Sequence, residues 1–333
     1  MIRSLAFSIV AIAATVATAS ASADDLDNLA KKAVGEPAAL WVSTGTQNET
    51  SPVIKAFTTR FPALKIEHLT LLGAEMATRF AQEARAGQAP DIATVPADQA
   101  AALAGRGLLA EFDAKTYGVS KTFVPAPYAV ITAVSVYSLV SRKSVPEAEK
   151  PRTWDDLLNP KYKGKIGLPV FSHPLAQLPA DWGGDKATAY VEKLVAQQPI
   201  LNTSTASLAQ NVASGEVSVA LGNYHTAVFA QKAGAPIEII MLNPTPTTTN
   251  YSVINKKAPA PKTAALFVAW LTTEEGAKAY EDSTGRGNAY LPSTATAKLL
   301  AGRKVAEYPI GDVATMAGWI SRYNELLKRA SAK

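Results

Sequence analysis

The sequence lacks the residues on which most enzyme and metal-site chemistry depends. It contains no cysteine, which excludes a disulfide framework, a thiolate zinc site and a cysteine nucleophile. It has only three histidines, His68, His173 and His225, and they stand far apart. A Gly-x-Ser-x-Gly elbow, a His-Glu-x-x-His motif and a Gly-rich phosphate loop are also missing. We therefore expect a protein that is not an enzyme and that carries no cofactor of its own.

Basic runs and long hydrophobic runs are scarce too. The formal net charge is +5, and aromatic residues do not alternate with Lys or Arg, so we expect no nucleic-acid partner. After residue 23 no stretch approaches the roughly 20 apolar residues of a membrane span. The hydrophobic share of 47% over 333 residues is enough for a packed core, and this length suggests about two domains.

Residues 1–23 have the pattern of a secretory signal peptide. Arg3 supplies positive charge, Leu5–Val16 form a short apolar run, and Ala21-Ser22-Ala23 fits a small-x-small cleavage site before Asp24-Asp25. We expect removal of these residues and a periplasmic mature protein. The absence of cysteine is compatible with that oxidising compartment.

The first part of the mature chain alternates strand and helix patterns. Ala39–Val42 is read as a buried strand that ends in the polar loop Ser43–Glu49, followed by a helix with Ser51 as N-cap and Pro52 at its first position. The same order of strand and helix repeats as far as Gly105. Such alternation predicts a mostly parallel sheet covered by helices on both faces.

A second unit of the same kind follows, with strands expected at Ile166–Phe171 and Val217–Gly222. The two units are separated by the long β-prone run Ala129–Val140 and by the segment Pro244–Thr249, which we interpret as two crossing hinge strands. The chain ends in a strongly amphipathic helix over residues 313–327. The predicted fold is therefore α/β, with two lobes and a ligand cleft between them.

Hydroxyl groups gather where predicted strands end and helices begin, which is where ligands bind in open α/β sheets. Each residue could equally be a simple N-cap, but their occurrence in both lobes favours a shared cleft. His68, on an alternating strand, is expected to be a packed or edge residue. The candidate ligand-binding residues are Ser43, Thr44, Thr46, Thr94, Tyr128, Ser172, His173, Thr203, Ser204, Thr205, Asn223 and Tyr224.

Four segments resemble the bacterial extracellular solute-binding proteins of ABC importers, in the branch that includes ferric-ion, thiamine, phosphonate and polyamine binders. The most specific is the third, which is similar to the family's Thr-Trp-x-Asp-Leu-x-x-Pro-x-Tyr-Lys-Gly-Lys signature. Together they span nearly the whole mature length. The segments are Val53–Pro62, Ala89–Ile92, Pro151–Ile166 and Lys257–Phe267.

The resemblance implies a type II periplasmic binding fold whose lobes close around a solute. Lobe 1 would comprise residues 24–128 and 251–300, and lobe 2 residues 129–250 and 301–333. The closed, liganded protein would then dock on a membrane permease whose partner ATPase drives import. The binding protein itself would be a monomer and would perform no covalent chemistry.

The cargo stays open between ferric ion and a small carboxylate- or phosphonate-bearing anion. Iron-binding members carry adjacent tyrosines after a second-lobe strand, whereas this chain has Gly222-Asn223-Tyr224-His225, with one tyrosine. They also carry a Ser-x-Arg-x-Arg run on the first hinge strand, where this chain has Tyr128–Ala133. Tyr224 could be a phenolate ligand to ferric ion, a hydrogen-bonding wall of the pocket or a packing residue.

Two other classes of function compete with solute import. A secreted α/β hydrolase is disfavoured by the missing nucleophile elbow. A two-lobed protein that binds a ligand for a signalling partner would have the same fold and the same cleft as a transport protein.

Overall fold

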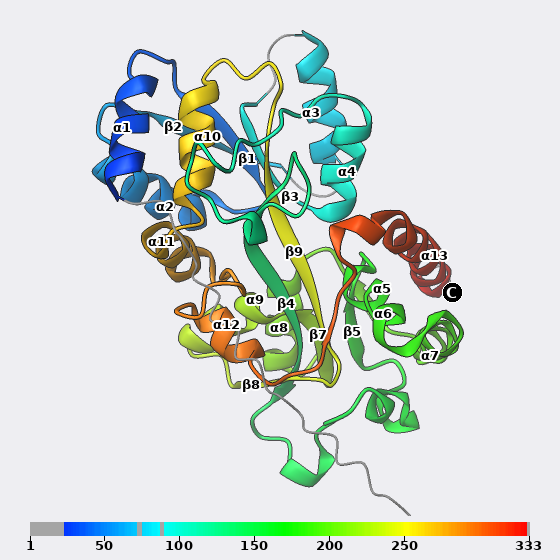
Figure 1. Ribbon diagram of the computed structural model, residues 1–333. Helices are drawn as coiled ribbons and strands as arrows, with labels where there is room; N and C mark the ends of the chain where they lie inside the picture. The colour runs from blue at the N-terminus through cyan, green and yellow to red at the C-terminus, as the bar shows by residue number, and fades with distance from the viewer. Residues whose placement is uncertain (1–22, 72–74, 87–89, 332–333) are drawn as a thin grey trace, which may run out of the picture.

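The protein has two α/β lobes joined by two long strands that run through both of them (Figure 1). The computed structural model describes residues 23–71, 75–86 and 90–331. The predicted signal peptide lies outside these residues except for Ala23, which begins the first helix. The strands are β1 Ala39–Ser43, β2 Ile66–Thr70, β3 Ile92–Pro96, β4 Val130–Arg142, β5 Ile166–Pro169, β6 Ile200–Asn202, β7 Val219–Asn223, β8 Ile237–Ile240, β9 Thr245–Ile254 and β10 Val305–Ala306.

Helices cover the sheet in both lobes. In Figure 1, α1 to α4 and α10 surround the strands of lobe 1, and α5 to α9 surround those of lobe 2. The helices are α1 Ala23–Ala33, α2 Gln47–Arg60, α3 Glu75–Ala86, α4 Ala97–Gly105, α5 His173–Ala176, α6 Pro179–Trp182, α7 Gly184–Ala196, α8 Thr205–Ser214, α9 Tyr224–Lys232, α10 Pro261–Trp270, α11 Glu274–Thr284, α12 Ala295–Leu300 and α13 Val313–Ser331.

The strand order is β2-β1-β3-β9-β4-β7-β5-β6, with β8 added to β4 and β10 added to β9. Within each lobe the pairs β1–β2, β1–β3, β5–β6 and β5–β7 are parallel, whereas β9 is antiparallel to both β3 and β4. Parallel neighbours end at the same edge of a sheet, so the loops after β1 and β3 share one edge in lobe 1, and those after β5, β6 and β7 share one in lobe 2. This topology confirms the predicted fold class.

The lobes meet where β4 and β9 cross from one core to the other. Val134 pairs with Thr249 and Val136 with Thr247 at this point. On β4, Ala133 still belongs to the hydrophobic core of lobe 1, whereas Tyr137 already belongs to that of lobe 2. Both strands pass through without a break, so they form the hinge on which the lobes can move.

Each core is built around aromatic side chains. In lobe 1, the rings of Trp41 and Phe57 lie 5.2 and 5.1 Å from that of Phe267. In lobe 2, the rings of Trp154 and Tyr190 are 5.8 Å apart. These separations are typical of aromatic pairs, which add stability beyond the area they bury.

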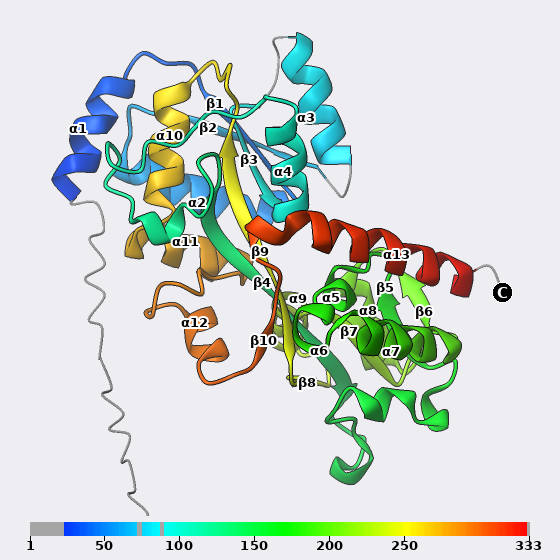
Figure 2. The same cartoon turned by 45° about the vertical axis from the view of Figure 1, so that its right-hand side comes forward.

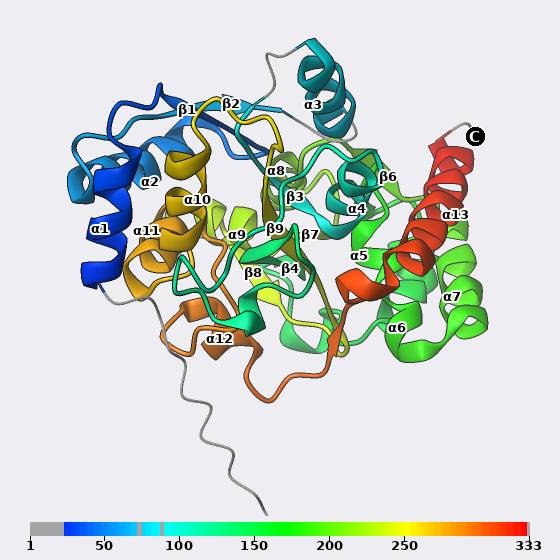
Figure 3. The same ribbon diagram turned by 45° about the horizontal axis from the view of Figure 1, so that its top comes forward.

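The last helix, α13, packs on both lobes. Met316 near its start is buried in the core of lobe 1, whereas Tyr323 and Leu327 are buried in that of lobe 2. Figures 2 and 3 show the helix beside α4, α5 and α7, and its contacts involve the same three helices. The lobe boundaries expected from the sequence stay a prediction, and α13 crosses from one core to the other.

Asp91, in the Pro90-Asp91-Ile92 part of the family-like segments, ties three elements of lobe 1 together. Its Oδ2 accepts a hydrogen bond from the backbone N–H of Leu40 on β1 at 2.7 Å. Its Oδ1 accepts one from Ala260, just before α10, also at 2.7 Å. Burial raises the pKa of Asp91, although these bonds favour its ionised form. The motif residue is therefore structural.

The start of α2 differs from the expectation. The helix begins at Gln47, with Thr46 as N-cap, and not at Pro52, which lies inside it. The reason is a capping box: the Thr46 backbone N–H donates to Glu49 Oε2 at 2.7 Å, and the Thr46 side chain accepts from the Glu49 backbone. The predicted loop Ser43–Glu49 was therefore too long, because its last residues form the first turn of the helix.

Candidate functional site

In lobe 2, several of the predicted site residues meet where β6 and β7 end. Ser204 is the N-cap of α8, and its hydroxyl accepts the backbone N–H of Ser207 at 3.2 Å. The Asn223 side chain donates to Thr205 Oγ1 at 3.2 Å, which joins the starts of α8 and α9. Tyr224, the first residue of α9, is half-buried beside them, whereas Thr203 is exposed.

In lobe 1, the loop after β1 carries Ser43, Thr44 and Thr46. Ser43 is buried, and its Oγ accepts the Gly45 backbone N–H at 3.1 Å and lies 2.9 Å from His68 Nε2. Thr44 and Thr46 are exposed, and Thr46 caps α2. Ser43 thus shapes the loop, and the two threonines are the residues that can reach a solute.

A buried arginine links the two lobes. Gly285 ends α11 in the left-handed conformation, with φ +67°, and places Arg286 directly after the helix. The Arg286 side chain is only 13% exposed, and its Nη2 lies 3.0 Å from His225 Nε2 of lobe 2 and 3.9 Å from Glu49 Oε1 of lobe 1. A guanidinium can only donate hydrogen bonds, so His225 Nε2 must accept and its proton must sit on Nδ1.

His225 therefore stays neutral while Arg286 carries the charge. Burial, and then the positive charge of Arg286, hold the pKa of His225 well below its usual value. Glu49 lies beyond hydrogen-bonding distance of Arg286, and its Oε2 already accepts from Thr46. The guanidinium is thus a mostly buried cation that forms an ion pair with Glu49 at 3.9 Å but no hydrogen bond to it.

A second contact between the lobes brings Asp98 and His173 together. Asp98 lies in the first turn of α4 and His173 is the first residue of α5, and Oδ1 of the one lies 3.7 Å from Nε2 of the other. Burial opposes ionisation of Asp98, but His173 and backbone N–H groups at the start of α4 outweigh it and lower its pKa. Asp98 is therefore a carboxylate at neutral pH.

Tyr137 lies on the hinge strand β4. It is buried on β4, just past the crossing point, with its hydroxyl 3.4 Å from Thr248 Oγ1 of β9. Burial raises the pKa of Tyr137 to about 12, and the charges of Arg286 and Asp98 act on it in opposite directions. Arg286 and Asp98 thus supply one positive and one negative side chain in the two contacts between the lobes.

Three other predicted site residues are used for structure. Ser172 is fully buried and bonded to α13: its Oγ donates to the Ile320 carbonyl and its backbone N–H to Asn324 Oδ1, both at 3.0 Å. Thr94 is buried in lobe 1 and accepts from Trp41 Nε1 at 2.9 Å. Tyr128 packs on the core of lobe 1 at the outer end of β4, where β4 pairs with the end of β9.

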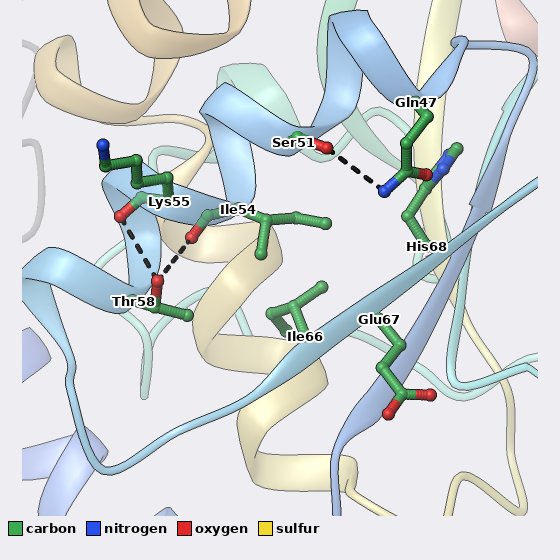
Figure 4. A pocket seen from close by; sticks show the side chains of 8 residues that line it. All are labelled: Gln47, Ser51, Ile54, Lys55, Thr58, Ile66, Glu67 and His68. Carbon is green, nitrogen blue, oxygen red and sulfur yellow. Dashed lines mark hydrogen bonds between the residues drawn. The ribbon is translucent and has the colours of Figure 1, made fainter.

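A separate hollow of about 570 Å³ lies on lobe 1 alone (Figure 4). Gln47 and Ser51 line its α2 side and Glu67 and His68 its β2 side, and none of the residues predicted to bind the solute is among them. Both ring nitrogens of His68 already face hydroxyls, at 2.9 Å from Ser43 and 3.1 Å from Thr50. Burial lowers the pKa of His68 to about 4, as befits a packing residue.

Two further features bear on the chemistry of the described residues. No group of three or more His, Cys, Asp or Glu side chains among them could hold a metal ion. A phenolate such as that of Tyr224 is not counted in such a group. Within residues 23–71, 75–86 and 90–331, no helix has the length and apolar character needed to cross a membrane.

The structure thus has two α/β lobes joined by β4 and β9, with the contacts Arg286–His225 and Asp98–His173 between them. The family model for bacterial extracellular solute-binding proteins matches residues 53–313. The chain belongs to this family, and the class of function predicted from the sequence, solute binding, is confirmed.

Solved structures with this fold hold different solutes. Iron-bound HitA from Pseudomonas aeruginosa is 18% identical, with a TM-score of 0.73 over 87% of this chain and 99% of that one. AfuA from Actinobacillus pleuropneumoniae, with fructose-6-phosphate bound, is 18% identical, with a TM-score of 0.69 over 87% and 98%. An "Uncharacterized protein" of Haemophilus influenzae is 27% identical over 139 residues, which are 38% of this chain and 39% of that protein.

The sequence predictions missed the charged groups of the site. Arg286 is not among the residues that the sequence predicts for the site. The available signal was Gly285 itself, since a glycine that ends a helix fixes where the next side chain points. Asp98 could have been noticed as an acidic residue two positions after β3, at the same sheet edge as Ser43.

Proposed function

We propose that the chain is the periplasmic solute-binding component of an ABC importer and that its cargo is a small anion bound between the lobes. Arg286 is the observation that carries this proposal. Its guanidinium is 13% exposed, contacts neutral His225 of lobe 2, and is not hydrogen-bonded to Glu49, whose Oε1 lies 3.9 Å away. A carboxylate or phosphonate would supply the bidentate acceptor that such a group prefers.

The hydroxyl groups near the strand ends support the same cargo. Thr44 and Thr46 in lobe 1 and Ser204 and Tyr224 in lobe 2 would donate to the remaining oxygens of the anion. The solved relative AfuA holds fructose-6-phosphate, whose phosphate is a small anionic group of this kind. Lobe closure about β4 and β9 would bring both sets of donors to one solute.

The proposed rigid bodies are residues 24–128 with 251–300 and residues 129–250 with 301–333. Two contacts at the lobe junction, Arg286 with His225 and Asp98 with His173, support a closed form held from both sides. Small-angle scattering should show a smaller radius of gyration after solute is added, with the mass of a monomer throughout. Identical curves with and without a proven solute would contradict closure.

The test of the anion begins with native mass spectrometry of protein purified from its own periplasm, which weighs any retained solute. The solute is then titrated by calorimetry into the parent and into Arg286→Gln, which should bind about 10- to 100-fold more weakly because a charged hydrogen-bond donor is lost. Arg303→Gln is the control, because Arg303 is exposed and its side chain donates to the Leu299 carbonyl. Equal affinity in all three proteins would reject Arg286 as the anchor.

Ferric ion is the second candidate, because Tyr224 is the residue before His225, which contacts Arg286, and HitA is an iron-bound structure of the same fold. The positive charge of Arg286 next to His225 disfavours a bare trivalent cation at this place. Iron binding predicts a visible phenolate band after ferric citrate is added, and Tyr224→Phe should abolish it. A protein that stays colourless would remove iron as the cargo.

Transport rather than catalysis or sensing is tested in cells. Deleting the gene should abolish uptake of the solute through its permease and ATPase, whereas a sensor would leave uptake intact. Cell fractionation should place the mature chain in the periplasm, beginning at Asp24. Purified protein incubated with the solute should return it unchanged, and steady product formation would instead indicate an enzyme.

A further inference from the structure

A third part of the chain runs between the lobes beside β4 and β9. It is the segment of residues 301–312 between α12 and α13, which we call the strap (Figures 1 and 2). The strap contains β10, which pairs in parallel with Thr245 and Pro246 of β9 before the crossing. Further along the strap, Ile310 is buried in the core of lobe 1. Any rotation of the lobes about β4 and β9 must therefore also move the strap.

The strap is fastened to lobe 2 on either side of Glu307. The Lys304 ammonium lies 2.7 Å from Asp181 Oδ1 on α6. The Tyr308 backbone N–H donates to Gln177 Oε1 at 2.8 Å, and Gln177 is fully buried. These two contacts hold the strap in place, so the Glu307 side chain reaches β9 from a fixed position.

At the crossing, both hinge strands point backbone N–H groups outward. Val134 of β4 is paired with Thr249 of β9, yet the Val134 N–H donates away from β9, to the Gly287 carbonyl at 2.8 Å. The pair is thus of the antiparallel type in which neither residue bonds the other. The Thr249 N–H accordingly donates to Glu307 Oε1 on the other side. The crossing is therefore bonded along both edges, to the residue after Arg286 and to the strap.

Glu307 holds β9 with both of its carboxylate oxygens. Its Oε2 accepts from Thr247 Oγ1 at 2.6 Å, while Oε1 accepts from the Thr249 N–H, so the carboxylate spans the part of β9 that passes between the lobes. Burial raises the pKa of Glu307, and the bonds from Thr247 and Thr249 act against this. Hydrogen bonds to an ionised acceptor are roughly twice as strong as neutral ones. This contact therefore resists any change in the backbone of β9 at the crossing.

We propose that Glu307 is a latch on the hinge, which holds the lobes in the conformation described here and whose loss lets them open. Hinge motion changes the φ and ψ angles of a few residues in the connecting strands. Such a change between Thr247 and Thr249 would move apart the two donors that Glu307 accepts, so its bonds favour one hinge angle. At that angle both contacts between the lobes are made, and the latch thus favours the closed form. The inference rests on the proposed lobe closure but not on the nature of the solute.

The experiment measures the distance between the lobes directly. Because the chain has no cysteine, two spin labels can be attached at Thr59→Cys on α2 and Lys193→Cys on α7, both exposed positions in different lobes. Electron–electron double resonance is recorded on the full mature chain without added solute. Glu307→Ala, which removes both acceptors, should populate a second, open distance about 10-fold more than the parent does. Glu307→Gln keeps one acceptor oxygen and should give a smaller increase.

Glu325→Ala is the matched control, because Glu325 is exposed on α13 and makes an ion pair with Lys328 at 3.0 Å. It should keep the distance distribution of the parent. Amide hydrogen exchange gives a second measurement at the latch itself. The Thr249 N–H should exchange at least about 10-fold faster in Glu307→Ala, whereas the amides of β1 and β5, in the cores of the two lobes, should keep their parent rates.

One shared distance distribution in all four proteins, or an unchanged exchange rate at Thr249, would overturn the latch. Faster exchange throughout β1 and β5 in both Glu307 variants would also reject it, because Glu307 would then support the fold of the lobes and not the hinge angle. Failure of lobe closure itself would appear separately, as identical scattering curves of the parent with and without its solute.

Discussion

Replacing Asp91 by asparagine should destabilise lobe 1 without touching the solute site. Asparagine can still accept one of the two backbone hydrogen bonds that Asp91 accepts at 2.7 Å, from Leu40 and Ala260. Its NH2 group must then face the other N–H, so one bond is lost and a buried donor meets a donor. A hydrogen bond to a charged group contributes about 1.5–3 kcal/mol.

The burial that raises the pKa of Asp91 offsets part of this, because the neutral amide is easier to bury. We therefore expect Asp91→Asn to lower the free energy of unfolding by about 2 kcal/mol. For a protein of this size that corresponds to a fall in Tm of roughly 3 °C.

Thermal unfolding followed by circular dichroism measures the change, with Asp282→Asn as the matched control. Asp282 makes an exposed ion pair with Lys278 at 2.8 Å, and such pairs contribute about 0.5 kcal/mol or less. The control should melt within about 1 °C of the parent protein. If Asp91→Asn has the same Tm as Asp282→Asn, the Asp91 carboxylate does not hold β1 and α10 in place. The structural role given to Asp91 is then wrong.

Three further changes test other parts of the fold. A Cβ on Gly276 would lie 2.0 Å from the Trp270 carbonyl oxygen, so Gly276→Ala should cost about 2 kcal/mol or more in urea unfolding, whereas Gly318→Ala, with no atom within 4 Å, should stabilise α13 slightly. Ser172→Ala should lower Tm but leave solute affinity unchanged; weaker binding would return Ser172 to the site. The pKa of about 4 for His68 lies below its unfolded value near 6.5, so the parent should lose stability as pH falls through this range, and His68→Gln should lose less.

The architecture could be predicted because it follows from local patterns. The alternating strands and helices, the two long β-prone segments and the amphipathic stripe of α13 each lie within a short window of sequence. The start of α2 was missed although its signal was also local. The prediction used Pro52 as the first helical residue, whereas the helix begins at the capping box formed by Thr46 and Glu49.

The site was harder to predict because its charged residues meet only after folding. Arg286 and His225 are 61 positions apart, and Asp98 and His173 come from different lobes. The hydroxyl residues at predicted strand ends do lie at the edges of the sheet where strands end, but the sequence could not separate residues that face a solute from residues that bond within the protein. Ser172 and Thr94 fit the pattern, yet their hydroxyls are bonded to α13 and to Trp41.

The position of β9 has a consequence for the order of events during synthesis. Lobe 1 begins near the N-terminus, but its strand β3 needs β9, and β9 pairs with β4 as well. The ribosome must therefore complete about three quarters of the chain before the N-terminal lobe can close its sheet. Nascent chains that stop before Thr245 should remain sensitive to protease, a delay that suits a family whose members work outside the cytoplasm.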